Sequence, residues 1–113
     1  MALNFDNDIN PMVTFLLNDT EVRWNKANRI FWLNDGVKQI RYMRGDSTLD
    51  EWDDVEYSAY VDGSGNDVIL ADIFLHSIVN YIVWKCYDQD SQDEFNMQLS
   101  QRWEQNFRTE VNK

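Results

Sequence analysis

The sequence Phe-Trp-Leu-Asn-Asp-Gly-Val-Lys-Gln-Ile, residues 31–40, decides how much of this chain forms one continuous helix. Its centre, Asn34-Asp35-Gly36, has the composition of a turn. Apolar residues nevertheless recur at steps of three or four on both sides of this tripeptide, a spacing typical of one buried helical face. They are Trp24, Ala27, Ile30, Leu33, Val37 and Ile40. We therefore predict that the helix continues through Gly36.

We make a further prediction for each of two residues in the tripeptide. Asn34 projects near the edge of the apolar face, so its amide is expected to cap or cross-link a neighbouring segment. Gly36 falls roughly opposite that face, where a missing side chain leaves no hole in the core. A second backbone, such as that of an adjacent subunit, could approach closely there. Gly36 is therefore a candidate interface residue.

The segments before this helix are short. Residues 1–10 are polar and rich in Asn and Asp, which predicts a loose leader. Pro11 is suited to the first turn of a short helix that runs through about Leu17. Asn18-Asp19-Thr20 then stops that helix, and either Asp19 or Thr20 could cap the next one.

Residues 44–69 connect this helical half of the chain to the next. Between 46 and 67 the sequence has eight carboxylates and no Lys or Arg. Strand-forming residues at 55–61 and 68–70 flank a strong turn, so a short hairpin is plausible. The turn superficially resembles a calcium loop, but the twelfth position from Asp62, where such a loop needs Glu, is Ile73. We therefore interpret it as a solvated turn.

Two more helices are predicted after this segment. Residues 71–89 are apolar around most of a helical circumference, which indicates a central helix with neighbours on several sides. Ser91 and Glu94 form a capping box for a last helix. Its apolar stripe consists of Phe95, Leu99, Trp103, Phe107 and Val111. The predicted fold class is mainly α: one domain over residues 1–113, a small bundle of about four helices with an acidic loop or β-hairpin at 46–69.

The amino-acid composition excludes several classes of protein. The chain has 113 residues with 20 acidic and 10 basic side chains, a net charge of −10, which argues against binding nucleic acid by neutralising phosphates. Its hydrophobic content of 43% is too high for a disordered tail. A single cysteine, Cys86, excludes an intramolecular disulfide. The sequence has neither a signal-peptide pattern nor an apolar run of the ~20 residues that cross a membrane. We expect a soluble protein made in a reducing cytosol, with no membrane partner.

Sites of catalysis and metal binding are not expected. Cys86 and His76 could suggest a nucleophile and its base, but ten residues on one helix separate them by ~15 Å. A buried structural cysteine and a half-exposed histidine are the simpler interpretation. The chain has no Gly-rich phosphate loop, no Cys/His metal spacing and no hydrolase elbow. We predict a protein that is not an enzyme and has no catalytic, cofactor-binding or metal-binding residues.

Two stretches resemble the small head-tail connector, or adaptor, proteins of tailed bacteriophages. Residues 23–40, RWNKANRIFWLNDGVKQI, match a tryptophan that precedes a helix containing Trp-Leu-Asn-Asp-Gly. Residues 70–107 match a later helix with an apolar run followed by Tyr81, Lys85, Cys86, Tyr87 and Asp90, and then a closing helix with aromatic spacing. The match covers somewhat more than half the chain. Many relatives carry a longer, strand-containing insertion where this chain has only residues 44–69.

The resemblance implies a structural virion protein at the head-tail junction, made in the host cytoplasm. Such subunits dock on the portal protein, form a homo-oligomeric ring, commonly of twelve copies, and extend the DNA channel. DNA passes through the channel without specific binding, and a tail or nozzle protein attaches to the ring. An acidic subunit suits a channel wall because it repels DNA.

Interface residues are expected on the last helix. Trp103 and Phe107 are flanked by Arg102 and Arg108, and aromatic residues with Arg are enriched in interface hot spots. The two aromatic side chains could instead face the core. An alternative function is an acidic cytosolic binding module, such as a phage-encoded inhibitor that mimics DNA, which the net charge of −10 would suit.

Overall fold

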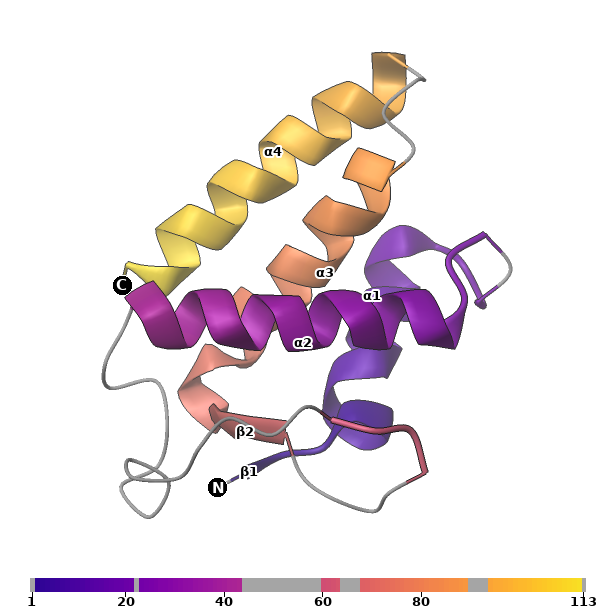
Figure 1. Ribbon diagram of the computed structural model, residues 1–113. Coiled ribbons are helices and arrows are strands. Elements are labelled where there is room, and N and C mark those ends of the chain that lie inside the picture. Colours follow the sequence, from indigo (N-terminus) through magenta and orange to yellow (C-terminus); the bar gives the residue numbers. More distant parts are fainter. Residues whose placement is uncertain (1, 22, 44–59, 64–67, 90–93, 113) are drawn as a thin grey trace.

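A computed structural model describes residues 2–21, 23–43, 60–63, 68–89 and 94–112 of the chain. It confirms a mainly α-helical protein built as a small bundle (Figure 1). The four α-helices are α1 (Asn10–Leu17), α2 (Lys26–Met43), α3 (Leu75–Gln89) and α4 (Glu94–Val111). Most of the acidic segment, at 44–59 and 64–67, lies outside the described residues, as does the expected capping serine, Ser91.

The amino-terminal residues are part of the fold. Strand β1 (Ala2–Leu3) pairs antiparallel with β2 (Val68–Ala71), and Phe5–Ile9 form a π-helical turn that leads into α1. Leu3, Phe5 and Ile9 are buried in the core. The prediction of a loose leader is therefore wrong here, because three apolar side chains outweigh the polar residues between them. The predicted strand at 68–70 does form, but its partner among the described residues is β1.

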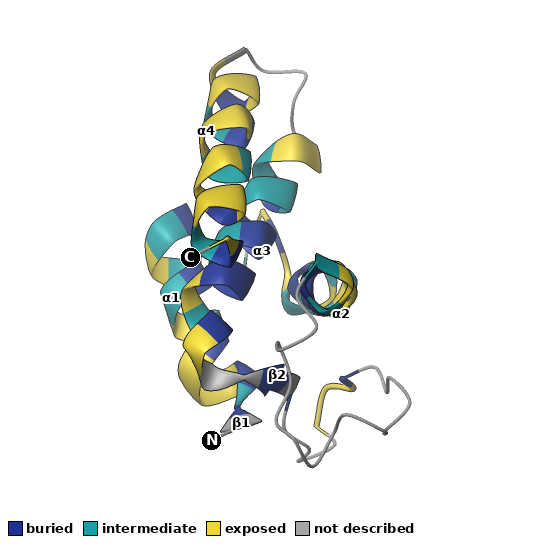
Figure 2. Cartoon of the chain, turned by 90° about the vertical axis from the view of Figure 1, so that its left-hand side faces the viewer, coloured by how far each residue is buried: buried dark blue, intermediate teal, exposed yellow. Residues whose placement is uncertain are grey.

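Helix α3 is central, as predicted. It follows a 3₁₀ turn (Asp72–Phe74) and contacts α1, α2 and α4. Figure 1 shows α4 running beside α3 while α2 crosses it. Figure 2 shows buried and half-buried residues along most of α3, as expected for a helix with neighbours on several sides. The buried residues of α3 are Ser77, Ile78, Val79, Tyr81, Ile82, Val83 and Cys86.

Helix α2 runs through Asn34-Asp35-Gly36 without a break, which confirms the prediction from periodicity. It begins at Lys26, and the Asn25 side chain accepts the Asn28 N–H at 2.9 Å as its cap. Asp19 caps no helix directly. Its carboxylate accepts the N–H groups of Arg23 and Trp24, both at 3.1 Å, and so fixes the connection between α1 and α2.

Asn34 cross-links a neighbouring segment, as expected. Its amide oxygen accepts the Tyr60 N–H at 2.8 Å, and its amide nitrogen donates to the Tyr60 carbonyl at 3.1 Å. Lys26, at the start of α2, pairs with Asp6 and Asp62, each at 2.8 Å. The side chains of α2 thus hold residues 60–62 at two points, on either side of the exposed Val61.

Gly36 lies inside the molecule, against α3. A Cβ atom at this position would stand 2.6 Å from Ile78 Cδ1 and 2.6 Å from Tyr81 Cδ1. Asp35 accepts a hydrogen bond from the Tyr81 hydroxyl and fixes the ring that Gly36 touches. The prediction of an outward-facing Gly36 is wrong, because the buried stripe of α2 differs from the expected one. The stripe consists of Arg29, Leu33, Gly36, Val37 and Ile40, while Ala27 is exposed.

Arg29 is fully buried, and hydrogen bonds account for all five of its N–H groups. The guanidinium Nε donates to the Trp24 carbonyl at 2.9 Å. One terminal nitrogen donates to Asn10 at 2.9 Å and Thr14 at 2.7 Å, both on α1. The other donates to the Asp19 carbonyl at 2.7 Å and the Asp19 carboxylate at 3.3 Å. This single side chain therefore joins α1, the α1–α2 connection and α2.

Replacement of Gly36 by Leu should destabilise the monomer strongly. The new side chain has no space at the α2–α3 contact, and overpacking a core typically costs ~1–3 kcal/mol or more. Urea denaturation of Gly36→Leu should show this loss, whereas the control Ala27→Leu, on an exposed position of the same helix, should change the free energy of unfolding by less than ~0.5 kcal/mol. Equal stabilities for the two variants would contradict this placement of Gly36.

Candidate partner-binding groove at the start of α4

A surface hollow lies where the α1–α2 connection meets the end of α3 and the start of α4. Its volume is about 330 Å³. Its walls combine apolar, aromatic and polar side chains, a mixture typical of binding sites. The lining residues are Leu17, Asn18, Asp19, Arg23, Trp24, Tyr87, Phe95, Asn96 and Leu99.

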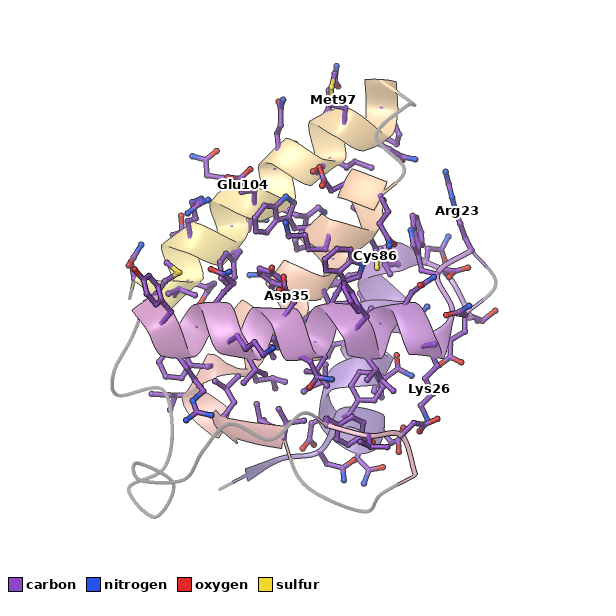
Figure 3. All side chains as sticks on the ribbon, in the orientation of Figure 1. Arg23, Lys26, Asp35, Cys86, Met97 and Glu104 are labelled. Atoms are coloured by element: carbon purple, nitrogen blue, oxygen red, sulfur yellow. The ribbon has the colours of Figure 1, made fainter. Side chains whose placement is uncertain are left out.

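A second hollow, of about 140 Å³, continues along α4. Phe95 and Leu99 line both hollows, and Gln98 and Arg102 complete the smaller one. We call the two hollows together the α4 groove. Figure 3 shows Arg23 on the connection before α2 and Met97 near the start of α4, at the same end of the bundle.

Local backbone geometry builds one wall of the groove. Asn18 ends α1 in the left-handed conformation, with φ of 51°, which asparagine tolerates well. The chain then turns, and Asp19 holds the next N–H groups in place. Trp24 is buried and meets the Tyr87 ring edge-on at a centroid separation of 5.5 Å, while the Arg23 guanidinium lies 4.9 Å from the Trp24 ring. The two aromatic rings join the connection to α3.

The start of α4 builds the opposite wall. Phe95 exposes 66% of its surface, and Met97 is also exposed. Asn96 is 95% buried in this wall, and its amide nitrogen has no hydrogen-bond partner. Large exposed apolar side chains beside a hollow are a common feature of protein interaction sites. The arrangement is thus suited to a partner that offers both apolar and polar groups.

The charges of the groove are uneven. Asp19 is paired with the buried Arg29, so much of its charge is compensated inside the protein. Arg23 and Arg102 are exposed; Arg23 lines the larger hollow and Arg102 the smaller one. Burial, with a smaller effect of the nearby Cys86, raises the pKa of Tyr87, which keeps its hydroxyl neutral at physiological pH. Each hollow thus has one exposed arginine among its lining residues, in a protein whose net charge is −10.

The predicted interface residues of α4 fall into different environments. Arg102 lines the groove and Arg108 is exposed, paired with Glu104 at 3.0 Å. Trp103 is half-buried against the core. Phe107 is 98% buried and packs on Tyr81 and Trp84 at centroid separations of 5.0 and 5.9 Å. Phe107 is thus a core residue, and its candidacy as a surface anchor is wrong, as is that of Gly36.

Sequence patterns named several groove residues, among them Leu99 and Arg102, but missed that Phe95 is exposed and Asn96 is buried. The expected stripe of α4 included Phe95, but this helix buries Asn96 and Ser100 in its first turns and Phe107 and Val111 later. A strict spacing of four residues drifts around a helix of 3.6 residues per turn, so its first members rotate out of the core. That drift was visible in the sequence and could have indicated an exposed Phe95.

Cys86 and His76 form no reactive pair. Cys86 is buried in α3, while His76 is exposed, as expected for a structural cysteine and a surface histidine. Burial raises the pKa of the Cys86 thiol to about 12, which suppresses the nucleophilic thiolate at neutral pH. In the described part of the chain, no group of three or more His, Cys, Asp or Glu side chains could hold a metal ion.

Comparisons with known proteins give no relative: no protein-family model, curated protein or solved structure matches this chain. Over the residues described, no helix combines the length and the apolar character needed to span a membrane.

The raised pKa of Cys86 predicts that its thiol is protected in the folded protein. At pH 8, Ellman's reagent should react with the native chain much more slowly than with the chain unfolded in urea, because only the unfolded chain exposes the sulfur and forms thiolate readily. The release of the coloured thiolate product measures both rates. Reaction of the native protein at the unfolded rate would place Cys86 in an accessible site.

Proposed function

We propose that this chain is a head-tail adaptor of a tailed bacteriophage. In this function it docks on the portal, closes a homo-oligomeric ring that extends the DNA channel, and receives a tail or nozzle protein. The proposal is supported by the Trp-Leu-Asn-Asp-Gly segment at 32–36 and the Tyr81-x-x-x-Lys85-Cys86-Tyr87 segment, whose family resemblance is described above.

The observation that carries the proposal is the distribution of apolar surface. Large exposed apolar side chains occur on separate elements: Phe15 on α1, with 82% of its surface exposed, Tyr42 at the end of α2, with 90% exposed, and Phe95 on α4. A subunit in a closed ring needs two different flanks for its neighbours, besides surfaces for the portal and the tail. Apolar side chains on several elements meet that requirement.

The contacts of the resemblance segments suit a structural subunit. Asn34 contacts Tyr60, while Asp35 and Gly36 both contact α3, Asp35 at the Tyr81 hydroxyl and Gly36 at the helix surface. These residues fix the subunit rather than a ligand. A rigid frame with exposed apolar patches is well suited to assembly, because little conformational freedom is lost on binding.

The acidity of the chain supports a position of this protein beside DNA in the channel. A net charge of −10 repels the phosphate backbone, so DNA could slide along a ring of such subunits without binding to it. A DNA mimic that binds a basic host protein would use the same charge. Its binding would weaken steeply with added salt, whereas docking through apolar side chains would persist.

Sedimentation velocity with the portal protein of the same phage tests the proposal. The purified chain alone should sediment as a monomer or a weak associate, and at micromolar concentration it should co-migrate with portal as a ring, in low and in high salt. A chain that does not co-migrate with portal at either salt concentration would overturn the proposal. Salt-sensitive binding to a basic host protein, without portal binding, would favour the DNA mimic.

A further inference from the structure

One buried polar group of the α4 groove has no hydrogen-bond partner in the folded chain. Asn96, in the first turn of α4, lines the larger hollow and is only 5% exposed. Its amide nitrogen is shielded from water and forms no hydrogen bond within the described part of the chain. A buried donor without an acceptor is costly, and folded proteins contain few of them. An acceptor supplied by another molecule would explain why this one is retained.

The same chain shows what an asparagine amide on a helix can bind. Asn34 makes two hydrogen bonds to the main chain of Tyr60, accepting the N–H at 2.8 Å and donating to the carbonyl at 3.1 Å. An asparagine amide has both the donor and the acceptor that match a peptide group. Asn96 has the same amide on α4, but over the described residues no carbonyl accepts from its nitrogen.

The larger hollow has room for a peptide segment with one large side chain. Its volume of about 330 Å³ is at the lower end of the range for binding pockets. Besides Asn96, α4 contributes the exposed Phe95 and the half-buried Leu99 to its lining. Rotation about the Cβ–Cγ bond of Asn96, a soft torsion, turns the amide nitrogen toward the hollow. One helix thus offers a hydrogen-bond donor next to two apolar side chains.

We propose that the larger hollow binds an extended peptide segment of another protein, with a main-chain carbonyl that accepts a hydrogen bond from the Asn96 amide. A large apolar side chain next to that carbonyl lies against Phe95 and Leu99. A second copy of this chain is less suited to the hollow, since it brings a further charge of −10 that repels the first. The site goes beyond the adaptor function, because it requires only a partner with such a segment.

A short uncharged peptide, acetyl-Gly-Phe-Gly-amide, tests the site directly. Titrated at millimolar concentrations into the isotope-labelled full chain, it should shift the side-chain amide resonances of Asn96 in NMR spectra until they saturate, because the new hydrogen bond changes their environment. The amide resonances of Asn34 are the control and should not move, since that amide is already bonded to Tyr60. The spectrum of Asn96→Leu identifies the Asn96 signals by their absence.

Leucine substitutions separate binding from folding. Asn96→Leu keeps a similar shape and removes a donor that has no partner in the folded chain, so the midpoint of urea denaturation should stay the same or rise. In the same titration this variant should bind the peptide about tenfold more weakly, equivalent to ~1.4 kcal/mol. The control Asn106→Leu, at an exposed position of α4, should leave binding within about twofold. Asn34→Leu should lower the urea midpoint, because it breaks both bonds to Tyr60.

Three results would overturn the inference: Asn96 resonances that the peptide does not shift, equal weakening of binding by Asn96→Leu and Asn106→Leu, or a urea midpoint that Asn96→Leu lowers as much as Asn34→Leu. Sedimentation velocity without peptide checks the occupant. Self-association of the parent chain that Asn96→Leu abolishes would assign the hollow to a second copy and contradict the proposal. Co-migration with portal is measured separately, so the adaptor function and this site can fail independently.

Discussion

The buried guanidinium of Arg29 is the constraint on which the rest of this structure depends. Transfer of a charge from water to a protein interior costs several kcal/mol, and that cost is offset only where partners satisfy the charge and every donor. Here Asp19 supplies the opposite charge, and Asn10, Thr14 and two backbone carbonyls take the remaining N–H groups. The arrangement is possible only if α1, the connection and α2 hold fixed relative positions.

The position of α2 in turn determines the remainder of the bundle. Gly36 lets α2 approach α3 closely, Asp35 holds the Tyr81 hydroxyl, and the other side of Tyr81 packs on Phe107 of α4. The α4 groove forms at the end of this series of contacts, since the connection that Asp19 holds provides one wall and α4 the other. A binding surface placed by such contacts is largely preformed, which limits the entropy lost on association.

Periodicity predicted the helices well, because local spacing reports which face is buried. It predicted continuity through Asn34-Asp35-Gly36, the central place of α3 and the cross-linking role of Asn34. The role of Arg29 and the inward position of Gly36 depend on partners that are distant in sequence, and a helical wheel cannot identify them. Arg29 falls on the same helical face as Leu33 and Ile40. A basic residue on a predicted buried face could have indicated a buried ion pair. Of the expected interface residues, Arg102 lines the groove, whereas Phe107 is in the core.

The free energy of unfolding of Arg29→Met tests most directly whether this network fixes the fold. The variant retains much of the apolar stem but leaves the Asp19 carboxylate and the α1 side chains without their donor. We predict a loss of ~3–5 kcal/mol in urea denaturation at neutral pH. We also predict a smaller additional loss when Asp19→Asn is combined with it, because the two changes remove the same interaction. A loss below ~0.5 kcal/mol, comparable to that of a surface substitution such as Arg108→Met, would contradict this account.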